Sequence, residues 1–122
     1  MTYVKQSGED FVIHESDNLL ILAMPGNLQL LALKSHWLCD GTFDSAPLGY
    51  QLYTVHALQD ECHTAPVVYC VAKNKNQDTY DMIFRTLKQV RPDLNPVSVT
   101  IDYERAALNS ITACFPNTII YG

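Results

Sequence analysis

The chain has 122 residues, 48% of them hydrophobic and 17% charged, with a formal net charge of −5 and a pI of about 5.1. This is the size and composition of one globular domain, and no repeat, linker or low-complexity segment divides it. The negative net charge argues against a protein that binds nucleic acid in general through a continuous basic surface. It does not argue against a nucleic-acid enzyme whose acidic residues bind cations.

No apolar run approaches the length of a membrane span, and the first residues lack the apolar centre of a signal peptide, so we expect a soluble intracellular protein without a membrane partner. The four cysteines show no C-x-x-C spacing and are expected to be buried thiols. Cys62 and His63 are adjacent, but two neighbours cannot form a zinc site, because structural zinc needs four ligands.

The N-terminal third predicts a hairpin and a short helix. Residues 1–10 are polar and are expected to form a tail. Residues 11–36 contain two apolar runs separated by polar residues, a pattern typical of a hairpin. Pro25-Gly26-Asn27 interrupts the pattern, and apolar residues at helical spacing then predict a short helix that ends near Lys34.

Residues 37–122 predict the main body. Runs rich in aromatic and β-branched residues predict three strands with short connections, at 37–43, 50–57 and 66–71. A helical stripe predicts a helix over 77–90, capped by Asn76. The remaining elements are a strand over 97–102, a helix with Leu108, Ile111 and Phe115 on one face, and a strand over 118–121.

This element order predicts an α/β fold with a mixed five-stranded sheet: three antiparallel strands, then βαβ units, with flanking helices. It is the ribonuclease H-like arrangement, in which the first and fourth strands are parallel neighbours. Asp40 and Asp102 would then lie close together near the carboxyl ends of those strands. Two carboxylates there suit Mg²⁺ or Mn²⁺, and a pair of such ions roughly 3.5–4 Å apart supports phosphodiester chemistry.

Each of these residues also has a structural interpretation. Asp40-Gly41 is a strong hairpin-turn signal, and Asp102 could be the N-cap of the next helix. Glu104 suits the positive end of that helix, with a supporting role beside the metal ligands as the alternative. His56 is a core or surface histidine in the simpler interpretation and a supporting or catalytic residue in the other.

Several spaced segments resemble the Mutator-like element (MULE) transposase domain, a DDE transposase domain with a ribonuclease H-like fold. They are Trp37-Leu38-Cys39-Asp40-Gly41-Thr42-Phe43, Tyr50 to His56, Pro66 to Tyr69, Lys75 to Tyr80, Thr100 to Ala107 and Phe115-Pro116-Asn117. The similarity covers about residues 11–122, nearly the whole chain, and the motifs agree in order.

The resemblance implies that Asp40 and Asp102 are the first two acids of the DDE triad and ligands of two divalent metals. The family cleaves DNA at element ends and joins the freed 3′ hydroxyl to target DNA. The implied partners are transposon ends and target DNA, the implied location is nuclear, and a homo-oligomer is compatible with this activity.

The family pattern continues beyond Gly122 to a third acid, a Glu, so we expect a core truncated before that acid, with an incomplete metal site and no activity alone. Two alternatives stay open. One is a domesticated, transposase-derived regulatory or scaffold protein without catalysis. The other, ranked last because the chain lacks a Gly-rich phosphate loop, is a small domain that binds an acidic or nucleotide ligand.

Overall fold

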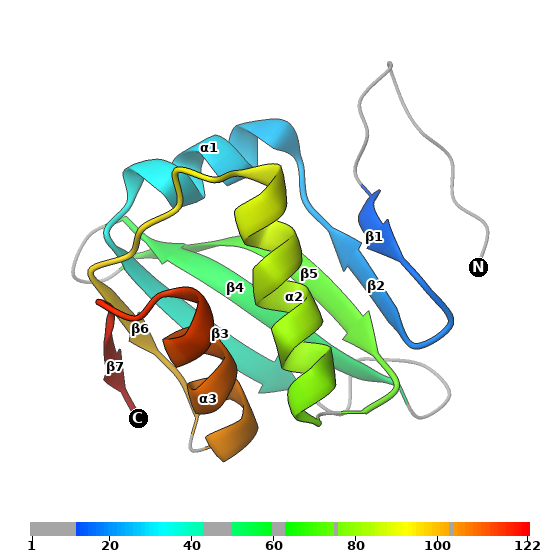
Figure 1. Ribbon diagram of the computed structural model, residues 1–122. Coiled ribbons are helices and arrows are strands. Elements are labelled where there is room, and N and C mark those ends of the chain that lie inside the picture. The colour runs from blue at the N-terminus through cyan, green and yellow to red at the C-terminus, as the bar shows by residue number, and fades with distance from the viewer. Residues whose placement is uncertain (1–11, 43–49, 60–62, 75, 103) are drawn as a thin grey trace.

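The computed structural model describes residues 12–42, 50–59, 63–74, 76–102 and 104–122. The tail predicted at 1–10 and the thiol of Cys62 lie outside the described residues. The described elements are three helices and one seven-stranded sheet (Figure 1). The strands are β1 (Val12–Glu15), β2 (Leu19–Leu22), β3 (His36–Thr42), β4 (Gln51–Leu58), β5 (Thr64–Ala72), β6 (Ser98–Thr100) and β7 (Ile119–Tyr121), and the helices are α1 (Pro25–Leu33), α2 (Gln77–Val90) and α3 (Arg105–Cys114).

The strand order in the sheet is β1-β2-β5-β4-β3-β6-β7. The prediction that the first and fourth strands of the main body are parallel neighbours is confirmed, because β3 pairs in parallel with β6. The predicted count of five strands is wrong. The N-terminal hairpin adds two strands to the same sheet, because β2 pairs antiparallel with β5 from Leu19–Ala72 to Leu22–Tyr69.

Two boundaries also differ from the prediction. Helix α1 begins at Pro25 rather than after it, because a proline in the first helical turn has no N–H to leave unpaired. Strand β6 is shorter than the predicted 97–102 and ends at Thr100. Within the described ranges, no helix combines the length and hydrophobicity needed to cross a bilayer.

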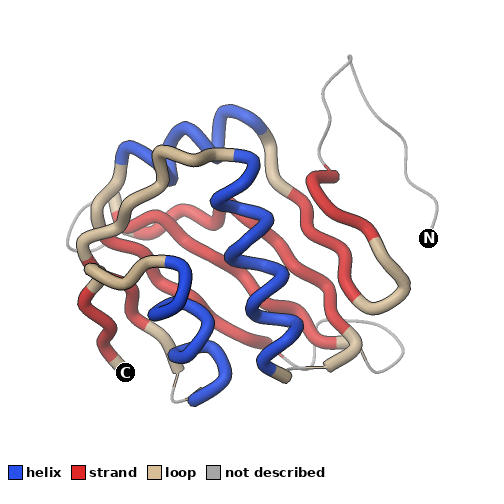
Figure 2. Tube along the Cα trace, in the orientation of Figure 1, coloured by secondary structure: helices blue, strands red, loops and turns tan. Residues whose placement is uncertain are grey.

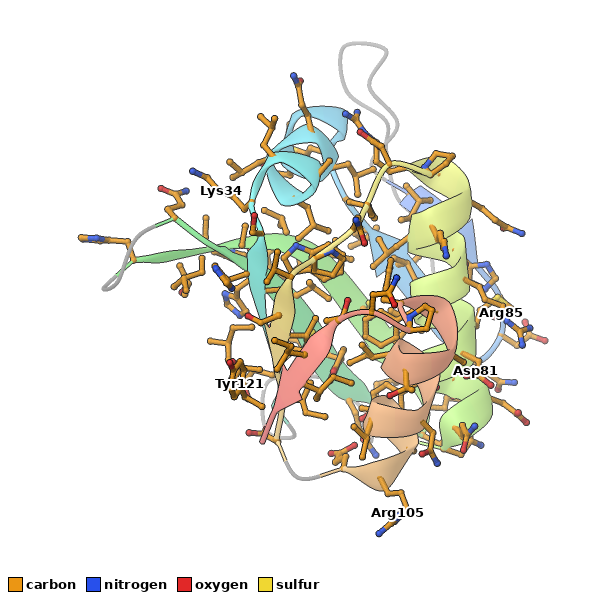
Figure 3. All side chains as sticks on the ribbon, turned by 60° about the vertical axis from the view of Figure 1, so that its left-hand side comes forward. Lys34, Asp81, Arg85, Arg105 and Tyr121 are labelled. Atoms are coloured by element: carbon orange, nitrogen blue, oxygen red, sulfur yellow. The ribbon has the colours of Figure 1, made fainter. Side chains whose placement is uncertain are left out.

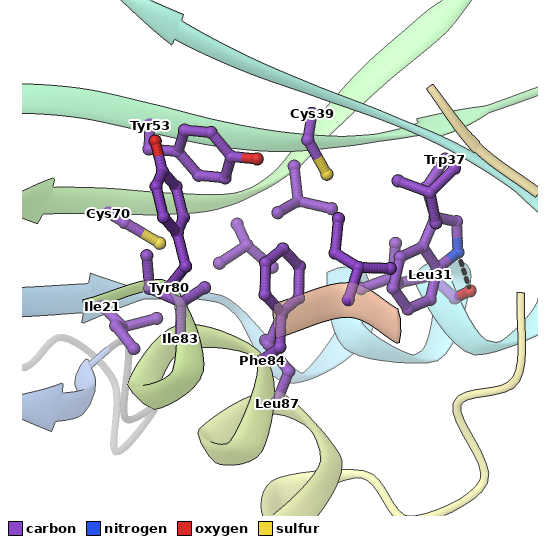
Figure 4. Packing of buried hydrophobic residues seen from close by; sticks show 14 of the residues in the cluster. Ile21, Leu31, Trp37, Cys39, Tyr53, Cys70, Tyr80, Ile83, Phe84 and Leu87 are labelled. Carbon is purple, nitrogen blue, oxygen red and sulfur yellow. Dashed lines mark hydrogen bonds between the residues drawn. The ribbon is translucent and has the colours of Figure 1, made fainter. Parts of the chain in front are cut away.

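The helices pack on one face of the sheet (Figure 2). Leu31 of α1, Phe84 of α2 and Ile111 of α3 are fully buried in one core cluster. Figure 4 shows Leu31 and Phe84 with Trp37 and Cys39 of β3 in this cluster. Figure 3 shows Tyr121 of β7 on the opposite side of the molecule from the polar surface of α2, which carries Asp81 and Arg85. Because side chains alternate along a strand, every second residue of a core strand points to the helices, and the residues between them point to the face that the helices leave uncovered.

Helix α2 is fixed at its start by two asparagines. As predicted, Asn76 is the N-cap, and its side chain accepts a hydrogen bond from the Thr79 amide at 3.0 Å. Asn74 supports the same turn, because its side-chain oxygen accepts from the Thr79 hydroxyl at 2.6 Å. These bonds satisfy donors that have no partner within the helix.

Replacing Asn76 with alanine is expected to lower the free energy of unfolding by about 1 kcal/mol, the usual cost of a lost side-chain cap. Asn76→Asp retains an acceptor oxygen and should stay close to the wild type. Urea denaturation followed by circular dichroism measures both. Gln89→Ala, at an exposed position of the same helix, is the matched control, and an equal effect in the two alanine variants would contradict the capping role.

Candidate functional site

Asp40 lies inside β3 and not in a turn. Its cross-strand partner on β4 is Thr54, and the pairing continues through Gly41–Tyr53 and Thr42–Leu52. The hairpin interpretation of Asp40-Gly41 is therefore wrong, because the strand runs straight through both residues. Trp37 and Cys39 point into the core, so Asp40, which is exposed, points to the face without helices.

Asp102 lies two residues beyond the end of β6 and is exposed. It does not cap α3. The N-cap of that helix is Glu104, whose carbonyl accepts from the Leu108 amide at 3.0 Å. The carbonyl of Asp102 instead accepts from the Glu104 amide at 2.6 Å, in the connection that joins β6 to α3. The capping interpretation of Asp102 is therefore wrong.

The pairing of β3 with β6 relates the two acids. The parallel register matches His36 with Ser98 and Leu38 with Thr100. The first pair is reinforced by a 2.6 Å hydrogen bond between His36 Nδ1 and Ser98 Oγ, across 62 residues of sequence. Asp102 follows Asp40 by the same 62 residues. The printed pairing ends at Leu38 and Thr100, so Asp40 lies two residues beyond it on β3 and Asp102 two residues beyond it after β6, at the same end of the two strands.

His56 and Thr54 lie on the same face of β4 as each other, beside Asp40. The Thr54 hydroxyl donates to the Asp40 carbonyl at 3.3 Å, and His56 Nε2 lies 3.0 Å from the same hydroxyl. The tautomer of His56 sets which of the two groups donates in the second bond. His56 Nδ1 is buried without a hydrogen-bond partner among the described residues. His56 thus reaches Asp40 through Thr54 and the backbone.

Glu104 contacts a helix on the other side of the sheet. The hydroxyl of Tyr80, a residue of α2 that is only 1% exposed, donates to the Glu104 carboxylate. Burial raises the pKa of Tyr80 well above its ordinary value, and the hydrogen bond to Glu104 raises it further. The phenol is therefore a permanent donor at neutral pH. This bond draws Glu104 toward the helix layer and away from the face that bears Asp40.

The site is exposed rather than enclosed. A pocket of about 340 Å³ lies beyond the ends of β6 and β7, but neither Asp40 nor Asp102 lines it. Its lining residues are Ile101, Glu104, Arg105, Leu108, Ile120 and Gly122. A surface-exposed pair of acids is accessible to a large substrate, whereas the pocket is mainly apolar and has one cation and one acid.

The donors present fit a hard cation only in part. Two carboxylates supply the oxygen ligands that Mg²⁺ and Mn²⁺ prefer. Among the residues that the structure describes, however, no group of three or more His, Cys, Asp or Glu side chains converges on one point. The residues predicted to support the site reach the acids through backbone groups. His56 contacts the Thr54 hydroxyl, which donates to the Asp40 carbonyl, and the Glu104 amide donates to the Asp102 carbonyl.

Thr54 and Tyr80 are missing from the predicted site. Thr54 could be found only through its pairing with Asp40, which requires the register of β3 and β4. Tyr80 fits the apolar stripe of α2 so well that its hydroxyl carries no sequence signal.

The sequence pattern of a family described as the MULE transposase domain matches residues 36–120 of this chain. The match begins with β3, extends into β7 and includes both Asp40 and Asp102. No curated protein matches the chain.

Proposed function

Because the chain belongs to the MULE transposase domain family, we propose that it is the core of a metal-dependent enzyme that cleaves and joins DNA. Membership of a transposase family implies interaction with DNA in general. The single observation that supports the finer proposal is the parallel pairing of β3 with β6 from His36–Ser98 to Leu38–Thr100, because each acid follows that pairing by two residues. Such strand ends are where ligands bind in open α/β sheets.

The proposal includes a ribonuclease H-like core. Its support is the strand order β5-β4-β3-β6-β7, in which three antiparallel strands are followed by two that join in parallel through helices. In this core the hairpin β1–β2 is an addition to one edge of the sheet.

In the proposed site, the carboxylates of Asp40 and Asp102 would hold Mg²⁺ or Mn²⁺. When bound, such ions activate an attacking oxygen and stabilise a leaving one at a phosphodiester. Two nearby carboxylates repel each other unless a cation offsets their charge, which favours binding. Neighbouring residues hold the acids in place: Thr54 and His56 lie beside Asp40 on β4, and Glu104 bonds to the backbone of Asp102.

Among the residues that the structure describes, no third His, Cys, Asp or Glu side chain joins Asp40 and Asp102 in one group. We therefore expect this chain to bind metal weakly and to leave DNA uncut, because the number and placement of ligands set metal affinity. Transposon ends and target DNA as substrates, a nuclear location and self-association during strand transfer are further parts of the proposal.

Titration calorimetry with Mn²⁺ tests the metal site. The wild-type chain should bind weakly, and Asp40→Asn or Asp102→Asn should reduce the binding heat to background, because each replaces half of the carboxylate pair by a neutral amide. Asp17→Asn, an exposed acid between β1 and β2, is the matched control and should bind like the wild type.

Identical isotherms for the wild type and Asp40→Asn would contradict the proposed metal site. A regulatory or scaffold protein without catalysis would have the same fold, so metal binding that depends on both acids is the property that separates the two functions.

A further inference from the structure

Tyr80 lies in the core between the two segments that carry the acids. Its ring packs edge-on against Tyr53 of β4, with the ring centroids 5.0 Å apart and an interplanar angle of 69° (Figure 4). Tyr53 pairs with Gly41, the residue after Asp40. On its other side, the Tyr80 hydroxyl donates to Glu104, two residues after Asp102. One side chain of α2 thus contacts a residue that pairs beside Asp40 and a residue in the connection that follows Asp102.

The hydroxyl of Tyr80 is not needed for packing. The position belongs to the apolar stripe of α2, between helix and sheet, where phenylalanine would fill nearly the same volume. A buried hydroxyl costs free energy unless it is hydrogen-bonded, so its presence is compensated by the bond to Glu104.

Glu104 transmits that bond to Asp102. Its carboxylate accepts from Tyr80, and its amide donates to the Asp102 carbonyl at 2.6 Å. The neighbouring Ile101 amide donates to the Tyr121 carbonyl at 2.8 Å. The Asp102 side chain is exposed, so these backbone bonds, together with the buried Ile101 beside it, define where Asp102 lies.

We propose that Tyr80 is a positioning residue that acts through Glu104 to hold the connection between β6 and α3, so that Asp102 stays in register with Asp40. This inference rests on the proposed metal site for its consequence, but the ordering of the connection can be measured without metal.

The experiment uses Tyr80→Phe, Glu104→Ala and the double variant of the 122-residue chain. Hydrogen exchange by NMR should show the Ile101 and Glu104 amides exchanging about tenfold faster in Tyr80→Phe, because local opening becomes easier. Amides in the centre of β4 and β5 should be unchanged. The Mn²⁺ affinity should fall about tenfold, a typical effect of losing a residue that orients a ligand.

Three controls make the result specific. Tyr69→Phe removes the hydroxyl of an exposed tyrosine on β5 and should change neither measurement. Glu104→Gln keeps an acceptor for Tyr80 and should retain most of the protection. Tyr80→Phe should add nothing in the background of Glu104→Ala, because the two residues act as a unit.

Unchanged exchange at Ile101 and Glu104 in Tyr80→Phe would overturn the inference, as would additive effects in the double variant. Faster exchange with unchanged Mn²⁺ affinity would also overturn it, since the ordered connection would then be irrelevant to the acids. Absence of Mn²⁺ binding in the wild type would instead contradict the proposed function, and the exchange rates would still decide the role of Tyr80. If Tyr80→Phe does not fold, Glu104→Ala at its partly exposed position provides the same comparison.

Discussion

Replacing Trp37 with alanine is expected to lower the free energy of unfolding by about 3–5 kcal/mol, the usual cost of removing a large aromatic side chain from a core. Trp37 is 2% exposed and packs edge-on against Phe115, at a centroid distance of 5.5 Å. Its indole N–H donates to the Leu31 carbonyl at 3.1 Å. The substitution therefore leaves a cavity where β3, α1 and the end of α3 meet. Urea denaturation at equilibrium measures the loss.

Two further variants make this measurement specific. Leu33→Ala, at a 71% exposed position on α1, should stay within about 0.5 kcal/mol of the wild type. Trp37→Phe keeps an aromatic ring but loses the N–H, so its free energy of unfolding should lie between those of Trp37→Ala and Leu33→Ala. Because a whole domain of this kind is stable by only about 5–15 kcal/mol, Trp37→Ala is expected to be close to unfolding. A Trp37→Ala chain as stable as Leu33→Ala would contradict the core arrangement.

Alkylation of Cys39 by iodoacetamide is expected to be at least about a thousandfold slower than alkylation of Cys114 in the folded chain, because thiolate fraction and access set the rate. Cys39 is 1% exposed, and burial raises its pKa to about 12. Burial likewise raises the pKa of Cys70. Cys114 is partly exposed. Peptide mass spectrometry resolves the rate at each cysteine.

The pH dependence follows from the direction of these shifts. The thiolate fraction of Cys39 at pH 8 is about one in ten thousand and rises tenfold per pH unit until its pKa is reached. Its labelling should therefore still be accelerating at pH 10, where an unfolded thiol is already ionised. In urea above the unfolding midpoint, Cys39 and Cys114 should react at similar rates. Equal rates in the folded chain would show that Cys39 is not in the core.

The sequence predicts the part of the fold that depends on local pattern. Alternation and helical stripes locate the elements from β3 to β7, and the preference for parallel crossovers makes β3 and β6 neighbours. The position of the hairpin could not be predicted, because a pair of short apolar runs does not reveal which sheet edge it extends. Nor could the start of α1, where Pro25 marks either a break or a first turn.

For the candidate site too, one part could be predicted from the sequence and another could not. The topology alone predicts Asp40 and Asp102 at one end of the sheet, and the structure shows the parallel pairing of β3 with β6 that ends two residues before each acid. The contacts of the residues that support the acids depend on which side chains face each other across strands and between a helix and a loop. Thr54 next to Asp40 and Tyr80 next to Glu104 are such contacts, and no one-dimensional spacing encodes them.

The matched 62-residue spacing determines where this chain tolerates insertions and deletions. The loops between the elements from β3 to β6 can change length if His36 still pairs with Ser98, because this pairing, and not the number of intervening residues, sets the relative height of β3 and β6. One residue inserted between His36 and Asp40 would instead turn the carboxylate to the helix-covered face, because side chains alternate along a strand. Length variation among relatives should therefore fall between the two pairing segments, 36–40 and 98–102, and spare both.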